Sequence, residues 1–300
     1  MTTESTKPKP RRRWWQFSLR TLLVVLTVLC VWLGWLSYEA RKQRKAVAAI
    51  IELGGTVYYD YQLDDSGQPA DGAEPPGPMW LRQFLGPDFF DDVVAVRFEP
   101  DYVPGRFSFS TRVLTGVDIS DLSSLEAPLR QLPALEELGL AYTQVSDLSP
   151  LAGLTSLESL DLTGTQVTDL TPLAKLTRLQ ILDLNDTPVS DLTRLAKLTS
   201  LERLNLSDTQ VSDVTLLANL TNLRELDLGR TQVKNVTPLA GLKNLEQLDL
   251  QFTQVVDVTA LAGLTRLDSL NVIATRVSEH QYRRLRKALP NLEIVWCPFP

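Results

Sequence analysis

The chain has very little histidine or cysteine, two residue types that many catalytic and metal sites use. It has one histidine and two cysteines among 300 residues. Cys30 lies in an apolar run and Cys297 at the far end, so neither a disulfide framework nor a metal-site spacing is present. No Gly-rich phosphate loop follows a strand-like segment, and no Ser or Cys nucleophile can be paired with a base. The sequence therefore predicts no catalytic residue, no metal site and no cofactor.

Positive charge is scarce outside the first part of the chain. Residues 1–45 hold ten Lys or Arg against two Glu, whereas residues 46–300 hold 20 basic against 34 acidic side chains. Phosphate binding requires a basic footprint, so no nucleic-acid partner is predicted. A body this acidic favours cations or basic partners instead.

One long uncharged run is present, from Thr21 to Ser37. As a helix, these 17 residues span about 26 Å, slightly less than a hydrocarbon core of about 30 Å. We therefore predict a single transmembrane anchor over residues 17–38. A cleaved signal peptide is the alternative, although four basic residues separate the small residues Ala46-Val47-Ala48 from the run. Six Lys or Arg before the run and four after it favour a cytoplasmic N-terminus, with the rest of the chain across the membrane.

A leucine phrase with a period of 22 residues occupies the C-terminal half. It opens at Leu132, Leu154, Leu176, Leu198, Leu220, Leu242 and Leu264. A fixed period in this range predicts a stacked coil, because one copy cannot bury its apolar face alone. The expected fold class is α/β, with a curved parallel sheet on the concave side and short helical turns on the convex side. A threonine returns in every copy from Thr143 to Thr275, and we expect its hydroxyl to bond locally at the bend.

Two kinds of position in the repeat are candidates for a binding surface. The middle strand position carries Asp161, Asp183, Asp227 and Asp249, and neighbouring strands lie about 4.8 Å apart. Stacked carboxylates could hold a cation such as Ca²⁺ or basic groups of a partner, although the same residues also fit a purely structural repeat consensus. Other outward positions vary between copies, and they supply the large or basic side chains that usually anchor interfaces: Tyr142, Arg203, Arg230 and Phe252.

The phrase LxxLxxLxLxxTxVxDLxPLAx, repeated over Leu154–Leu264, resembles the 22-residue leucine-rich repeat class of the internalins. Threonine stands where many members of the class carry an asparagine ladder. The N-terminal anchor and the end helix also resemble bacterial membrane-bound leucine-rich repeat proteins of unassigned role. The resemblance implies a curved solenoid and protein recognition in general, but it transfers no partner and no binding residue.

The expected organisation has six parts. They are a disordered basic tail (1–16), the transmembrane helix (17–38), a flank with a helix, a strand and a Pro-rich linker (39–92), irregular first repeats (93–131), regular repeats (132–277) and a C-terminal cap helix and strand (278–300). The predicted function is binding of another protein through the concave face. The alternatives are a cation- or glycan-binding envelope component that uses the aspartates, and a cytosol-facing scaffold for a signalling enzyme.

Overall fold

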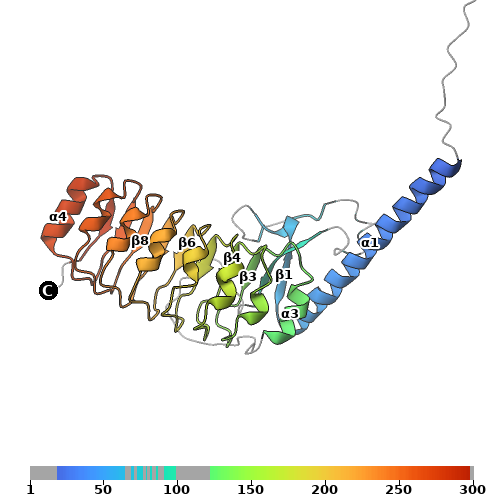
Figure 1. Ribbon diagram of the computed structural model, residues 1–300, viewed down its shortest axis with the longest axis horizontal. Helices are drawn as coiled ribbons and strands as arrows, with labels where there is room; N and C mark the ends of the chain where they lie inside the picture. Colours follow the sequence, from blue (N-terminus) through green and yellow to red (C-terminus); the bar gives the residue numbers. More distant parts are fainter. Residues whose placement is uncertain are drawn as a thin grey trace, which may run out of the picture.

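The computed structural model describes residues 19–64, 69–70, 73–76, 79, 82, 86, 91–98 and 122–297. The predicted tail at 1–16 and residues 99–121 lie outside this range, as does most of the predicted linker. The described part is a gently curved rod, with one long helix leaving its N-terminal end obliquely and a shorter helix closing the other end (Figure 1).

The rod is built on one sheet of ten strands in sequence order. The first pair is antiparallel, and every later pair is parallel. The strands are β1 (Thr56–Tyr59), β2 (Val93–Arg97), β3 (Glu137–Gly139), β4 (Ser159–Asp161), β5 (Ile181–Asp183), β6 (Arg203–Asn205), β7 (Glu225–Asp227), β8 (Gln247–Asp249), β9 (Ser269–Asn271) and β10 (Glu293–Val295). From β3 to β9 the paired residues are always 22 positions apart, so the repeat register predicted from the leucines is confirmed.

Short 3₁₀ turns cover the side opposite the strands. They are η3 (Ser149–Leu151), η4 (Thr171–Lys175), η5 (Leu195–Lys197), η6 (Thr215–Asn219), η7 (Thr237–Gly241) and η8 (Thr259–Gly263), while η1 (Asp60–Gln62) follows β1. Ser and Thr are common helix caps, but the side chain of the Ser or Thr near the start of these turns makes no capping hydrogen bond. In five of the six turns an aspartate Oδ1 two residues earlier accepts the backbone N–H instead, as Asp213 does from Thr215 at 2.8 Å. In η7 the amide oxygen of Asn235 takes this role, so a short side-chain acceptor starts each turn whether or not it is ionised.

A single apolar core runs from Ala46 to Leu292 through all the repeats. The predicted threonine ladder borders this core. The Oγ1 atoms of Thr143, Thr165, Thr187, Thr209, Thr231, Thr253 and Thr275 each donate to the carbonyl three residues earlier, at 2.5–2.7 Å. The local bonding predicted for these hydroxyls is therefore confirmed, and each buried hydroxyl is satisfied within its own copy.

Two helices close the ends of the core. At the C-terminus, α4 (Glu279–Ala288) begins at Ser278, whose side chain accepts from the Gln281 N–H, and β10 follows as predicted. At the N-terminus, α1 (Leu19–Glu52) packs against β1 and α3 (Ser123–Leu129). The apolar part of α1 is long and apolar enough to cross a membrane, and no residue of its most apolar window is buried in the protein. One unbroken helix thus runs from the candidate membrane span into the N-terminal cap.

Candidate functional site

The strands leave a groove on the concave side of the sheet. The concave groove has a volume of about 450 Å³ and is lined by β5 to β9. Of the predicted site residues, Asp183, Arg203, Asp227 and Asp249 line it. The prediction missed Ile181, Glu225 and Gln247, which also line it. They occupy the same repeat position as Arg203, so the repeat itself was the signal that could have found them.

The aspartates at the ends of the strands first of all shape the backbone. Each accepts the N–H of the residue two positions later: Asp161 at 2.8 Å, Asp183 at 2.8 Å, Asp227 at 2.7 Å and Asp249 at 2.7 Å. The side chains of Asn205 and Asn271 then donate to the preceding Asp183 and Asp249, at 3.1 and 2.9 Å. The amides therefore relieve the repulsion between stacked carboxylates at these two places.

The charge of Asp227 is less well compensated than the charges of the other groove aspartates, Asp183 and Asp249. It pairs in register with Asp249 on one side and Asn205 on the other. Asn205 and Asn271 donate to Asp183 and Asp249, so no asparagine of this column donates to Asp227. Desolvation, followed by the charges of Asp249, Asp183 and Asp208, raises the pKa of Asp227 to about 6, against the lowering effect of the Gly229 N–H. The centre of the groove therefore holds a carboxylate that is short of positive charge.

A second row of residues follows the strands, and its backbone is left-handed. We call this row the left-handed strip; it consists of Tyr142, Gly164, Asp186, Asp208, Arg230, Phe252 and Ala274. The six non-glycine residues have φ between 53° and 57°. This conformation costs an L-residue about 1–2 kcal/mol, and Gly, Asn and Asp tolerate it best. The chain places Tyr142, Arg230 and Phe252 there despite that cost.

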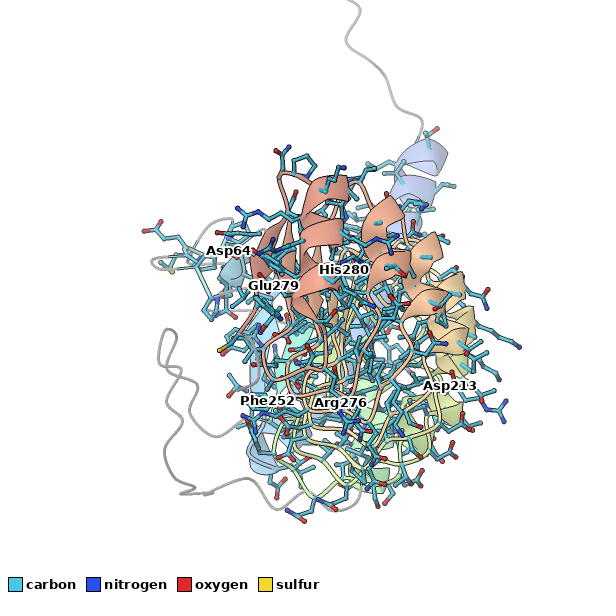
Figure 2. The ribbon with its side chains drawn as sticks, turned by 90° about the vertical axis from the view of Figure 1, so that its left-hand side faces the viewer. Asp64, Asp213, Phe252, Arg276, Glu279 and His280 are labelled. Carbon is cyan, nitrogen blue, oxygen red and sulfur yellow. The ribbon has the colours of Figure 1, made fainter. Side chains whose placement is uncertain are left out.

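The large side chains of the left-handed strip pack against neighbouring residues of the strip. The Arg230 guanidinium lies over the Phe252 ring at 5.0 Å and reaches Asp208 at 3.8 Å. The Tyr142 ring lies on Gly164, where an added Cβ would come within 2.6 Å of Cδ1. Tyr142 and Phe252 remain 46% and 51% exposed, which leaves their rings available for contact. In the end-on view, Phe252 lies on the opposite side of the coil from Asp213, which starts η6 (Figure 2).

The strained backbone of the strip has a measurable consequence. We expect Ala274→Gly to stabilise the chain by about 0.5–1 kcal/mol, because glycine adopts a positive φ without the Cβ clash. Ala274 has φ 53°. The matched control is Ala240→Gly in η7, where the backbone is not left-handed and glycine should destabilise the chain. Urea unfolding of both variants checks the prediction, and a loss of stability in Ala274→Gly would contradict it.

The arginines of the site are already paired within the chain. Arg203 lies in the groove at 3.1 Å from Glu225, and Arg230 on the strip lies 3.8 Å from Asp208. Asp161, Tyr142, Arg230 and Phe252 do not line the groove itself. Among the residues that the structure describes, no group of three His, Cys, Asp or Glu side chains is arranged to hold a metal ion. His280 lies exposed on α4 (Figure 2) and does not line the groove.

Comparisons with known proteins agree with this architecture. A family profile described as "Leucine Rich repeats (2 copies)" matches residues 155–197 and 199–241. Crystal structures of an internalin (inlF) and of an internalin C2 (inlC2) from Listeria monocytogenes are both 32% identical to the chain, with TM-scores of 0.54 and 0.53. The matches cover 59% and 57% of the chain, and 56% and 75% of the two internalins. No curated protein matches the chain.

The chain belongs to the leucine-rich repeat family, in its internalin-like class. A leucine-rich repeat protein of Leptospira interrogans, 24% identical with a TM-score of 0.53, shares the fold; the match covers 56% of the chain and 44% of that protein. These neighbours come from bacteria. Because the chain spans only about half of the length of two of these three proteins, the comparisons carry the repeat fold and not a whole-protein activity. Proteins of this family generally mediate protein–protein interaction.

Proposed function

We propose that the chain is a single-pass membrane protein whose solenoid binds another protein through the concave groove and the left-handed strip. The N-terminus lies in the cytoplasm and the repeats lie on the other side of the membrane. The observation that carries the binding surface is the presence of Tyr142, Arg230 and Phe252 at left-handed positions that favour smaller residues. Aromatic and arginine side chains are the usual anchors of protein interfaces.

The apolar half of α1 supports the membrane part of the proposal. Its most apolar window has a mean hydropathy of 2.0, and no residue of that window is buried in the protein. Such a helix would expose a long apolar surface to water, which soluble proteins avoid. Insertion into a bilayer removes that surface from water. The cation- or glycan-binding alternative has no comparable support, since the groove aspartates are engaged by backbone N–H groups.

In-cell crosslinking tests the binding surface. A photoreactive amino acid replaces Phe252 on the strip or the exposed Lys197 of η5 on the convex side, in the full chain. We expect a discrete crosslinked protein from position 252 and little from position 197. Arg203→Glu combined with Arg230→Glu should lower the yield from position 252 by about tenfold or more, because both side chains lose their charge complementarity with the partner.

The matched control reverses two arginines outside the groove. Arg178 and Arg266 pair with Glu158 and Glu246, so Arg178→Glu with Arg266→Glu makes the same change in net charge and breaks a comparable number of ion pairs. This control should crosslink like the wild type. Equal yields from positions 252 and 197 would contradict the proposed surface.

Labelling of a thiol tests the membrane orientation. A membrane-impermeant thiol reagent, applied to the same intact cells, should label Cys297 if the repeats lie outside the cytoplasm. No labelling before lysis favours the cytosolic scaffold.

A further inference from the structure

The second half of α1 has one packed face and one open face. Ala40, Gln43, Ala46, Val47 and Ile50 are buried at helical spacing. The side-chain amide of Gln43 also donates to the Asp91 carbonyl at 2.7 Å, which fastens the helix to the segment before β2. The helix therefore reaches the cap with no flexible linker, and its packed face fixes which residues point away from the protein.

Basic residues occupy the open face. Arg41 and Lys45 are exposed, and within the described part of the chain neither has a hydrogen bond or an ion pair. The nearby Lys42 is different: it pairs with Glu39 at 3.3 Å and lies 4.4 Å from the centre of the Tyr38 ring. Two cations on one face of a rigid helix, with no partner among the described residues, present positive charge outward.

Their height along the helix matches the polar layer of a membrane. The apolar run ends near Leu36, so at 1.5 Å per residue Arg41 lies about 7–8 Å beyond it and Lys45 about 13–14 Å beyond it. The headgroup layer extends about 5–8 Å outside the hydrocarbon core. Arg41 is thus at the depth of the phosphates, and Lys45 lies within a Debye length, about 10 Å, of them.

We infer that Arg41 and Lys45 form a docking surface for the anionic phospholipid headgroups of the leaflet that faces the solenoid. This inference rests on the proposed membrane anchor. Anionic lipids attract basic residues next to a membrane span, and each contact improves association by about fivefold. Since α1 is packed into the cap, a contact on its open face also holds the solenoid in one orientation relative to the bilayer.

Reconstitution of the full chain tests the inference. Wild type and Arg41→Gln with Lys45→Gln are placed in phosphatidylcholine vesicles containing spin-labelled phosphatidylglycerol, and electron paramagnetic resonance measures how strongly the labelled lipid associates with the protein. We expect the double variant to lower the preference for phosphatidylglycerol over spin-labelled phosphatidylcholine by about fivefold or more. High salt should reduce the preference of the wild type. The basic residues before the span are the same in both proteins, so they contribute equally to the lipid association that is measured for each.

The control is Arg178→Gln with Arg266→Gln, which removes two charges from the repeats and should leave the lipid preference unchanged. An unchanged preference in the Arg41→Gln, Lys45→Gln variant overturns the inference. The inference is also overturned if the Arg41→Gln, Lys45→Gln variant keeps its lipid preference but no longer binds an acidic protein that the wild type binds. In that case the open face of α1 binds a protein and not lipid. Release of the wild-type chain from the vesicles by an alkaline wash would overturn the membrane anchor itself, and this inference with it.

Discussion

Replacement of Leu206 by aspartate is expected to unfold the central repeats. Leu206 is fully buried in the common core, directly after β6. An aspartate there would be an unpaired charge among leucines, and the site would also lose its apolar side chain. We expect a loss of more than about 4 kcal/mol, which is large against the total stability of most domains. Denaturant unfolding followed by circular dichroism measures the loss.

Hydrogen exchange locates where the damage occurs. Stability in a repeat array is approximately a sum over copies and their interfaces, so amides of the copies next to Leu206 should exchange much faster than those near α4. Gln210→Asp is the control: it introduces the same charge in the same copy, but at an exposed position. That variant should unfold like the wild type. A wild-type unfolding curve for Leu206→Asp would mean that the leucine does not point into the core.

Asp227→Asn should stabilise the protein at neutral pH. The pKa of this carboxyl in the folded chain is about 6, above the ordinary 3.8, because burial and the neighbouring carboxylates oppose its charge. The folded state therefore holds this proton more tightly than the unfolded chain does. The stability that the protonated form contributes is complete below about pH 4 and is lost as the pH rises to about 6. Asparagine keeps the neutral form at every pH, so the variant should gain about 1–2 kcal/mol at pH 7, allowing for partial solvent screening.

Unfolding measured from pH 4 to pH 7 checks this prediction. The difference in stability between the variant and the wild type should grow with pH over that range and then level off. Asp213→Asn provides a comparison of opposite sign, because the hydrogen bonds from Thr215 lower the pKa of Asp213. That variant should lose stability by a constant amount from pH 7 down to about pH 4, and the loss should shrink only at lower pH, where the wild-type carboxyl itself becomes protonated. A pH-independent difference for Asp227→Asn would show that its pKa is not raised.

The sequence predicts the interior of this protein better than its surface. The 22-residue register, the threonine ladder and the capped end helix follow from residue type and spacing, because burial leaves few alternatives for a leucine or a threonine at each position. The backbone of the strip was not predictable in the same way. Tyr142 and Phe252 are poor residues for a positive φ, so local preference indicates the wrong conformation, and the stacked bends impose the observed one.

The candidate binding residues are harder to predict for a related reason. Asp183 and Asp249 were candidates for a ligand, but asparagines of the next strand already bond to them, and only the register of the strands reveals this pairing. The raised pKa of Asp227 is likewise a property of its neighbours on adjacent strands rather than of its own copy. Repeat sequences specify what each copy contains, whereas the chemistry of the concave groove arises between copies.

The unbroken course of α1 sets how far the groove can reach. From Leu36 to Glu52 the helix rises about 24 Å, and the six steps from β1 to β7 add about 29 Å. With the apolar half of α1 in a bilayer, as proposed, the centre of the groove lies at most about 53 Å beyond the end of the apolar run, and the unbroken helix keeps that distance nearly constant. A soluble partner must reach the groove by three-dimensional diffusion. A partner anchored in the same membrane reaches the groove by lateral diffusion, at a fixed height above the bilayer.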